Sequence, residues 1–414
     1  MSRKLAPALL LTLVAIGVAS ASAQAASCPI DERKSRAVSE RVGKKVQRAY
    51  EFYSEDKLNA ALNELLEIKA SNEFDKAYVS RMIGSLYAGQ DGKVDTAMKH
   101  LRSAVQSNQL GGSDHANALR LLGDLNISES EYQDALTYYN NWMKFTCKQD
   151  ENVYLRMSSA YYELKNYQQA IVHADKSIAL QSQPKKPALS IKMGSYYELK
   201  QYRNASKMAE SIVRHYPHEG RNWVQLAQMY MLSEDYKRAL YTMDIAHRKG
   251  YLERASEFKM LAQLYAQNDI PLKSAQIQEQ YLSDGMVERD GNAIAMLANT
   301  YHQAKDIPKA IQYYGEAGER TKDARHYMRQ AGLLMQSERY GDAKVAVRNA
   351  MNSRGLKSTG EAQMILLQAH FYLGEYQAAH RAANSALTDS NTARNAQSWL
   401  SYIEDTARRK NVTL

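Results

Sequence analysis

The chain has 414 residues, of which 44% are hydrophobic and 24% are charged, which is ordinary for a folded soluble protein and excludes a disordered one. A single globular core rarely grows to this length, but a repeat array does, because each unit packs only on its neighbours. The formal net charge is +9, so acidic partners and anionic surfaces are favoured over basic ones.

Residues 1–25 are predicted to be a cleaved signal peptide. Arg3 and Lys4 give it a positive start, residues 9–18 form an apolar run, and Ala23-Gln24-Ala25 fits the rule for a cleavage site. The run is too short for a membrane anchor, and no later run approaches the roughly 18 apolar residues of one. We therefore expect a soluble mature chain that begins near Ala26 and is exported, in bacterial style, to the periplasm. Nucleic acid is a poor candidate partner there.

Residues 26–40 form an N-terminal segment that contains Cys28, one of two cysteines; the other is Cys147. An even number of cysteines in an oxidising compartment suggests one disulfide, which would stabilise the chain by roughly 4 to 5 kcal/mol. One alternative is lipidation of Cys28 as the first mature residue, although Ala25-Ala26-Ser27 lacks the usual bulky residue before such a cysteine. Two free buried thiols are the other alternative.

Basic residues cluster at the start of the mature chain, whose net charge falls from +9 to +7 when Arg3 and Lys4 leave with the signal peptide. The cluster consists of Arg33, Lys34, Arg36, Arg41, Lys44, Lys45 and Arg48. It either meets an anionic membrane surface, an acidic cell-wall polymer or an acidic partner, or it is a solvated helix face.

An internal repeat runs through the chain. The heptapeptide that begins at Tyr161 recurs almost unchanged at Tyr196, an offset of 35 residues. A small residue follows each copy and recurs with a mean spacing of about 35 residues, the length of a helix–turn–helix repeat. We place it at Ala61, Ala97, Ala135, Ala170, Ala205, Ala239, Ser274, Ala310, Ala343 and Ala379.

One unit of the repeat shows two helices. Trp223, Leu226, Ala227 and Tyr230 share one face of a first helix, and residues 233–235 interrupt the pattern. Tyr236, Ala239 and Ala246 then share one face of a second helix. Pro271 and Pro308 are expected in the first turns of second helices, with Asp269 and Asp306 as their N-caps.

This pattern resembles the tetratricopeptide repeat. The resemblance implies an all-α, right-handed superhelical solenoid of about ten helix pairs over residues 41–390. Residues 391–414 are expected to form a capping helix and tail, in which Trp399, Tyr402 and Ile403 cover the last repeat and basic residues end the helix.

No catalytic motif or zinc-binding cysteine pair is present, and His215 and His218 beside Pro217 are a weak metal candidate. We therefore expect a binding protein rather than an enzyme, with no cofactor and no metal.

In the tetratricopeptide family the first helices line a concave groove. By that resemblance, an aromatic and soft row of groove residues is Tyr53, Tyr162, Tyr197, Met231, His302, Met335 and Phe371, and a hydrogen-bonding row is Gln228, Gln263, Asn299 and Gln368. The first row suits apolar anchors of a protein partner, and the second suits an extended peptide backbone. The alternative is that some of these tyrosines and methionines only support neighbouring helices.

Several stretches resemble one group of exported tetratricopeptide proteins, encoded beside TonB–ExbB–ExbD clusters in gamma-proteobacteria. They are Cys28-Pro29, residues 33–36, 40–46, 261–268, 302–305 and 392–396, and Trp399. The resemblance implies a periplasmic accessory role in TonB-dependent uptake, for example of iron siderophores. The partners would be subunits of the TonB complex or TonB-dependent receptors. An envelope scaffold for peptidoglycan or polysaccharide machinery, and a periplasmic chaperone for outer-membrane proteins, remain the alternatives.

Overall fold

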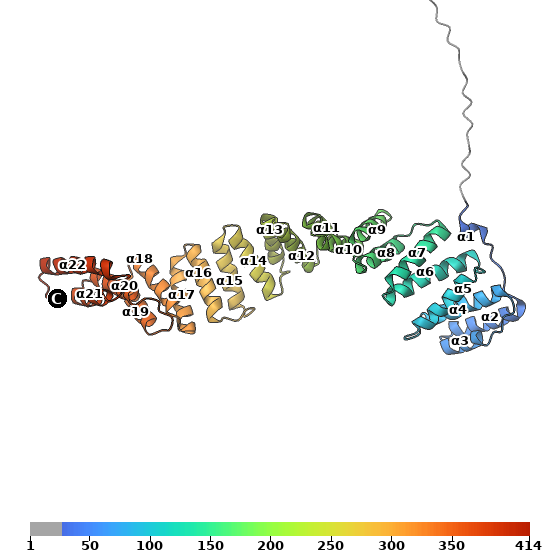
Figure 1. Ribbon diagram of the computed structural model, residues 1–414, viewed down its shortest axis with the longest axis horizontal. Helices are drawn as coiled ribbons and strands as arrows, with labels where there is room; N and C mark the ends of the chain where they lie inside the picture. Colours follow the sequence, from blue (N-terminus) through green and yellow to red (C-terminus); the bar gives the residue numbers. More distant parts are fainter. Residues whose placement is uncertain (1–26) are drawn as a thin grey trace, which may run out of the picture. The chain divides into compact units, whose positions relative to one another are not determined.

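The computed structural model describes residues 27–414, so the predicted signal peptide lies outside the described residues. Within 27–414 the chain forms 22 helices and no strand, and consecutive helices pack against one another from α2 to α9 and from α10 to α22 (Figure 1). The chain divides into two compact units, which meet in sequence between Gln183 and Pro184. None of the helices in the described part combines the length and the apolar character needed to span a membrane.

The first unit contains four helix pairs and one short additional helix. The pairs are α2 with α3, α4 with α5, α6 with α7 and α8 with α9, and α1 packs on α6 and α7. The bounds are α1 Pro29–Glu32, α2 Glu40–Ser54, α3 Leu58–Leu66, α4 Glu73–Tyr87, α5 Val94–Gln106, α6 Gly112–Ser128, α7 Tyr132–Thr146, α8 Glu151–Glu163 and α9 Tyr167–Ala179.

The second unit contains six helix pairs and a last unpaired helix, α22. The bounds are α10 Lys186–Glu198, α11 Tyr202–His215, α12 Gly220–Leu232, α13 Tyr236–Arg248, α14 Ala255–Gln267, α15 Pro271–Ser283, α16 Gly291–Gln303, α17 Ile307–Thr321, α18 Ala324–Gln336, α19 Tyr340–Met351, α20 Thr359–Tyr372, α21 Tyr376–Ala386 and α22 Ala393–Arg409. The two units together hold ten pairs, which confirms the predicted fold class of an all-helical repeat array with a terminal helix.

The small residue of the repeat lies at the fourth position of every second helix. Nine of these residues are alanines with 0% exposure, and Ser274 is 1% exposed. A side chain of this size lets the two helices of a pair approach closely, as the sequence predicted. The ten positions therefore mark the helix crossings of the array.

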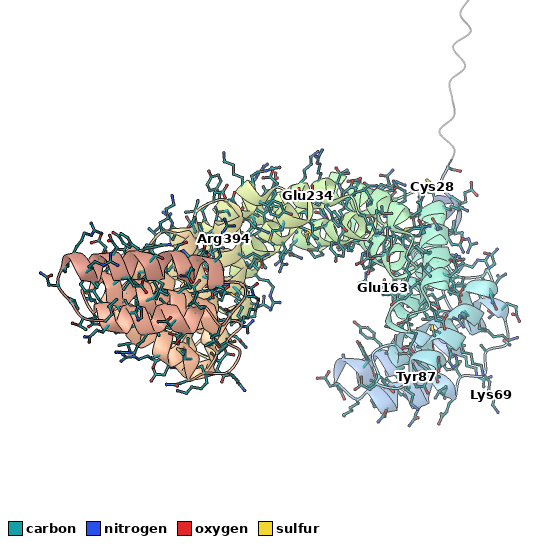
Figure 2. All side chains as sticks on the ribbon, turned by 60° about the vertical axis from the view of Figure 1, so that its left-hand side comes forward. Cys28, Lys69, Tyr87, Glu163, Glu234 and Arg394 are labelled. Atoms are coloured by element: carbon teal, nitrogen blue, oxygen red, sulfur yellow. A yellow bond between two sulfur atoms is a disulfide. The ribbon has the colours of Figure 1, made fainter. Side chains whose placement is uncertain are left out.

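Each turn within a pair contains one residue with positive φ, two positions before the second helix begins. Glu234, labelled in Figure 2, is one of them. The set consists of Asp56, Gly92, Ser130, Lys165, Lys200, Glu234, Asp269, Lys305, Glu338 and Gly374. Eight of the ten are not glycine, so composition alone does not reveal this turn.

The expected N-cap at Asp269 was wrong. Asp269 occupies the left-handed turn position, and Ile270 is the N-cap of α15 instead. Asp306 does cap its helix, because its carboxylate accepts a hydrogen bond of 3.2 Å from the Lys309 backbone N–H. The two aspartates differ because Pro271 is the first residue of its helix, whereas Pro308 is the second.

The terminal helix α22 is amphipathic and covers the last pair. Ile403 is fully buried, and Trp399 and Tyr402 lie 5.5 and 5.1 Å, respectively, from the Phe371 ring, between ring centroids. Arg408 and Arg409 occupy its last turn, where cations interact favourably with the helix dipole. Tyr402 remains 51% exposed, so it covers less of the last repeat than the sequence suggested.

Candidate partner-binding groove

The first helices α10, α12 and α14 of the second unit line a pocket of about 530 Å³. Its wall is rich in methionine: Met193, Met229, Met231 and Met260 all contribute. Methionine is flexible and polarisable, so such a wall adapts to the shape of an apolar group that enters it. We name this pocket the methionine pocket.

Tyr197 forms one side of the methionine pocket and is 44% exposed. Its ring packs edge-on against Tyr202, with 5.9 Å between ring centroids, so its position is fixed by the following helix. Gln228 is exposed beside it, and Gln225 also lines the pocket, so that two amides accompany the apolar side chains. The pocket therefore offers two amide groups that can form hydrogen bonds, and one aromatic ring held in place by its neighbour.

A second pocket, of about 840 Å³, lies between α14, α15 and α16. Its buried polar floor consists of Ser274, Gln278 and Thr300, and the Gln278 amide donates hydrogen bonds of 3.1 Å to both hydroxyls. Met286 and Met296 are exposed at its edge. We name it the amide pocket, since Gln278 and Gln263 both line it.

The two pockets bring together four of the residues that the sequence analysis selected. Tyr197, Gln228 and Met231 line the methionine pocket, and Gln263 lines the amide pocket. Because α14 contributes Met260 to one pocket and Gln263 to the other, the pockets occupy neighbouring parts of one surface. We call this surface, formed by α10, α12, α14 and α16, the groove.

The other selected residues lie on first helices but outside these two pockets. Tyr53 on α2 and Tyr162 on α8 belong to the first unit. His302 packs edge-on against Tyr314, with 6.2 Å between ring centroids, and Phe371 packs in the aromatic cluster with α22. The remaining three are Asn299 on α16, Met335 on α18 and Gln368 on α20.

Sequence reasoning missed several residues that build the pockets. Met193 and Met260 line the methionine pocket, although neither belongs to the two rows selected from the sequence. The floor of the amide pocket carried one signal, since Ser274 stands where the nine other pairs have alanine. A hydroxyl at that position supports the buried amide of Gln278.

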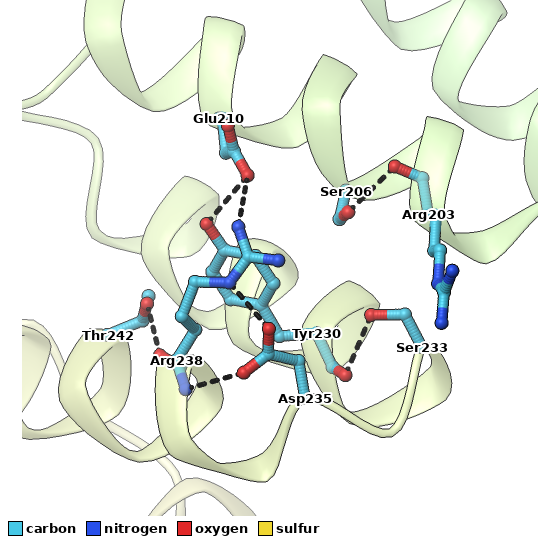
Figure 3. A network of polar contacts seen from close by, with 8 residues as sticks. All are labelled: Arg203, Ser206, Glu210, Tyr230, Ser233, Asp235, Arg238 and Thr242. Atoms are coloured by element: carbon cyan, nitrogen blue, oxygen red, sulfur yellow. Dashed lines mark hydrogen bonds and ion pairs between the residues drawn. The ribbon is translucent and has the colours of Figure 1, made fainter.

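Hydrogen bonds of one recurring type join neighbouring helix pairs of the second unit. Tyr230, Tyr265 and Tyr301, on successive first helices, each donate a hydrogen bond to a carboxylate on the preceding second helix. In Figure 3 the Tyr230 hydroxyl lies 2.8 Å from Glu210, and Arg238 contacts the same carboxylate at 3.2 Å. We call each such set, a tyrosine, a carboxylate and a cation, an inter-repeat latch.

The pKa values of the latch tyrosines indicate a structural role for their hydroxyl groups. Burial, together with the hydrogen bond to the Glu210 carboxylate and its negative charge, raises the pKa of the Tyr230 hydroxyl to about 12. The pKa values of Tyr265 and Tyr301 are raised to about 12 for the same reasons. These hydroxyls stay protonated at neutral pH and hold the carboxylates rather than transfer protons.

Titratable side chains do not gather into a metal site within residues 27–414, where no group of three or more His, Cys, Asp or Glu side chains is placed to hold an ion. His215 instead contacts the backbone oxygen of Ser211, at 2.8 Å from its Nδ1. Cys28 and Cys147 are joined in a disulfide, with their Cα atoms 5.9 Å apart.

The predicted basic cluster is partly neutralised. Lys44 pairs with Glu40 at 2.8 Å, and Lys45 and Arg48 both contact Glu64. Arg33 lies apart from these residues, against α7. The part of the cluster on α2 is therefore mostly a solvated, paired helix face rather than one positive surface.

Comparisons with known proteins agree with this architecture. Residues 85–143 match the family model of the tetratricopeptide repeat, and residues 168–300 match that of the ChAPs, the Chs5p-Arf1p-binding proteins. A comparison with curated proteins gives no match. The repeat type that the sequence suggested is therefore supported, whereas a relationship to TonB-associated proteins is not among these findings.

Solved structures resemble parts of the chain, and two of the three that follow are of tetratricopeptide repeat proteins. A tetratricopeptide repeat protein from Parabacteroides merdae is 15% identical over 63% of this chain and 99% of its own, with a TM-score of 0.39. MamA from Desulfovibrio magneticus is 22% identical over 41% of this chain and 93% of its own, with a TM-score of 0.34. The C-terminal part of a protein from Cytophaga hutchinsonii is 15% identical over 67% and 98%, with a TM-score of 0.36.

Proposed function

We propose that this protein is a periplasmic scaffold that binds a partner protein in the groove of its second unit. The methionine pocket carries the proposal, because a soft apolar pocket with a rigid tyrosine at its entrance is suited to an apolar anchor residue. Met193 and Met229 are nearly buried there, whereas Tyr197 is 44% exposed and accessible to a partner.

The amide pocket supports an extended peptide as the form of the bound segment. Gln263 is exposed on its wall, and Lys259, Glu288 and Asp290 add charged groups around it. An extended chain has unpaired backbone N–H and C=O groups, which amide side chains satisfy in both directions. A segment with an apolar anchor followed by polar residues fits the two pockets in turn.

The compartment and the system belong to the same proposal. The signal-peptide pattern of residues 1–25 and the Cys28–Cys147 disulfide support an oxidising, extracytoplasmic location. The stretches that resemble TonB-associated proteins support an accessory role in TonB-dependent uptake. The partner is then a subunit of the TonB complex or a TonB-dependent receptor.

Photocrosslinking in iron-starved cells tests this proposal. A photoreactive residue replaces Tyr197, and a control protein carries it at Tyr241, which is 55% exposed on the second helix α13. We expect a crosslink to a TonB-complex subunit or receptor from position 197 and not from position 241. Recovery of cell-wall enzymes, or of many outer-membrane proteins equally, would refute the TonB role and favour an envelope scaffold or a chaperone.

A substitution in the methionine pocket tests whether the crosslink from position 197 depends on binding in the groove. Met231→Glu places a charge in the methionine pocket, and burial of an unpaired charge against apolar groups is unfavourable. We expect it to lower the crosslinking yield from position 197 at least about fivefold while the helical circular dichroism is unchanged. An unchanged yield would show that the pocket is not the contact.

A further inference from the structure

The N-terminal segment of the described chain is fixed onto the first unit at both ends. At one end Cys28, labelled in Figure 2, is bonded to Cys147 at the end of α7. At the other end the Ser39 backbone and hydroxyl donate hydrogen bonds of 3.1 and 2.6 Å to the buried carboxylate of Asp75. We call residues 27–39 the strap.

The strap passes close to the start of α6. A Cβ atom at Gly112 would lie 2.6 Å from the Ile30 backbone oxygen and 3.2 Å from that of Arg33, so a larger residue would displace the strap. This close approach places Arg33 at a defined position on the unit.

Arg33 carries a charge that has no counter-ion among the described residues. Its guanidinium lies 4.9 Å from the centre of the Phe145 ring and donates a hydrogen bond to the Asn108 side chain. Its Nη1 is buried without a hydrogen-bond partner, and no carboxylate in residues 27–414 pairs with it. Burial also lowers the pKa of Arg33, as expected for a cation that has lost hydration without gaining an anion.

A pocket of about 410 Å³ lies beside this charge. Asn108 and Phe145, the two residues that contact the Arg33 guanidinium, both line it, and Lys144 is the cation among its lining residues; Arg33 reaches the pocket through those two contacts and does not line it itself. His115 also lines it; this side chain is 7% exposed, and its Nδ1 has no hydrogen-bond partner among the described residues.

The rest of the lining combines amides with apolar groups. Gln106 and Asn141 supply amide groups, and Val105 and Leu119 supply apolar surface. No aspartate or glutamate is among the lining residues that the structure describes. The pocket thus has positive charge, hydrogen-bond donors and an apolar wall, but no negative charge of its own.

We propose that this pocket binds a carboxylate carried beside an apolar side chain, as in the C-terminal residue of a peptide. Lys144 and Arg33 would compensate the carboxylate charge, the amides would bind the adjoining peptide group, and the apolar wall would accept the side chain. A phosphate fits less well because it has no apolar part to fill that wall. The site lies in the first unit and does not depend on the proposed groove.

Titration of the mature, disulfide-bonded chain by ¹⁹F NMR tests the site. The probes are acetyl-glycyl-4-fluorophenylalanine and its C-terminal amide, which differ only in the charge of the terminus. We expect saturable binding of the acid and at least about tenfold weaker binding of the amide, since a charge-assisted contact is lost. Equal binding of acid and amide would overturn the proposal.

Substitutions of Arg33 and Lys144 test whether these two cations stabilise the bound carboxylate. Arg33→Gln and Lys144→Gln are each expected to weaken binding of the acid at least about fivefold, whereas Arg36→Gln, an exposed residue of the same strap, should change it less than about twofold. Circular dichroism of each variant checks that the fold is retained. Unchanged affinity in both Arg33→Gln and Lys144→Gln would overturn the proposal.

Two further experiments test whether the site prefers a carboxylate to a phosphate and whether binding depends on the strap. If inorganic phosphate displaces the peptide acid at lower concentrations than acetate does, the site is a phosphate site and the carboxylate assignment is wrong. Replacement of both Cys28 and Cys147 by serine releases one end of the strap, so we expect weaker binding of the acid. Unchanged binding in that variant would contradict the part assigned to Arg33.

Discussion

Residues with left-handed backbone recur in every within-pair turn, and most of them are not glycine. A residue with a Cβ atom in this conformation costs about 1 kcal/mol relative to a relaxed one. Lys200, with φ of 57°, is an exposed example whose backbone N–H donates a hydrogen bond of 2.9 Å to Tyr197 O. The helical hairpin imposes positive φ at this position. The residue type there is only weakly matched to that conformation, since most of the ten residues are not glycine.

Lys200→Gly is therefore expected to stabilise the second unit by about 0.5 to 1 kcal/mol, because glycine adopts positive φ without strain. The matched control is Lys207→Gly, an exposed position inside α11, where glycine should lower stability by about 1 kcal/mol. Urea unfolding followed by circular dichroism measures both. Destabilisation by Lys200→Gly would show that the turn carries no strain.

Glu279 is the residue on which the latch between α15 and α16 depends. Its carboxylate accepts hydrogen bonds from Tyr301, Tyr313 and Lys309. Burial on its own would raise the pKa of Glu279, but these hydrogen bonds and the Lys309 charge outweigh it and lower the pKa. A lowered pKa in the folded state means that ionised Glu279 stabilises the fold.

Glu279→Gln should lower stability by about 1 to 2 kcal/mol at pH 7, since a charge-assisted network becomes a neutral one. The stabilisation by Glu279 is fully present above the pKa of an unfolded glutamate, about 4.3, and is lost as pH falls through the lower folded pKa. Unfolding of the wild type and the variant from pH 7 to pH 3 should therefore show a difference that shrinks below about pH 4. A constant difference, or an equal effect of Glu361→Gln at an exposed site, would argue against the latch.

Helices in this array are specified by how closely their neighbours approach as well as by their own pattern. Gly318, in α17, is buried, and a Cβ there would lie 2.8 Å from the Tyr327 ring on α18. Gly332, inside α18, has nothing within 4 Å of the same hypothetical atom. Gly318 is thus needed for helix packing, whereas Gly332 has no packing function.

Gly318→Ala is expected to destabilise the second unit by about 1 to 3 kcal/mol, because the methyl group must displace Tyr327. Gly332→Ala is expected to stabilise it by about 0.5 to 1 kcal/mol through helix propensity alone. Thermal unfolding of the two variants side by side gives the comparison. If both substitutions stabilise the protein, the Tyr327 ring moves aside without a loss of folding free energy.

The whole chain divides into two compact units, and each is a complete stack of helix pairs with its own core. In repeat arrays stability is approximately the sum of the repeats and the interfaces between neighbours. The second unit also carries the terminal helix α22, which protects its last pair from solvent. We therefore expect the second unit, residues 184–414, to fold without the first.

A fragment of residues 184–414 should therefore be monomeric and helical, with an unfolding transition close to that of the second unit in the full chain. Circular dichroism and calorimetry of the fragment measure this. Removal of α22 from the same fragment should lower its midpoint, because Ile403 and Leu400 leave apolar surface of the last pair exposed. A fragment that is unfolded at 25 °C would show that the first unit is needed for the core.

The candidate groove was only partly predictable. Tyr197, Gln228, Met231 and Gln263 line pockets, since helix periodicity and the family geometry together select one face of each first helix. Phe371 was selected by the same rule, but it packs against Trp399 of the terminal helix α22. Whether a residue selected for the groove lines a cavity depends on the spacing between helices. The periodicity of the sequence carries no information on that spacing.

The sequence by itself determined the repeat, the ten helix pairs and the small residues at their crossings, because a period of about 35 residues repeats one local packing problem along the chain. The tertiary structure alone decided the two pockets, the latches and the pairing of Arg33 with Phe145 and Asn108. The physical reason is distance along the chain. Crossings and turns arise within one hairpin, whereas pockets and uncompensated charges arise where side chains from separate hairpins meet.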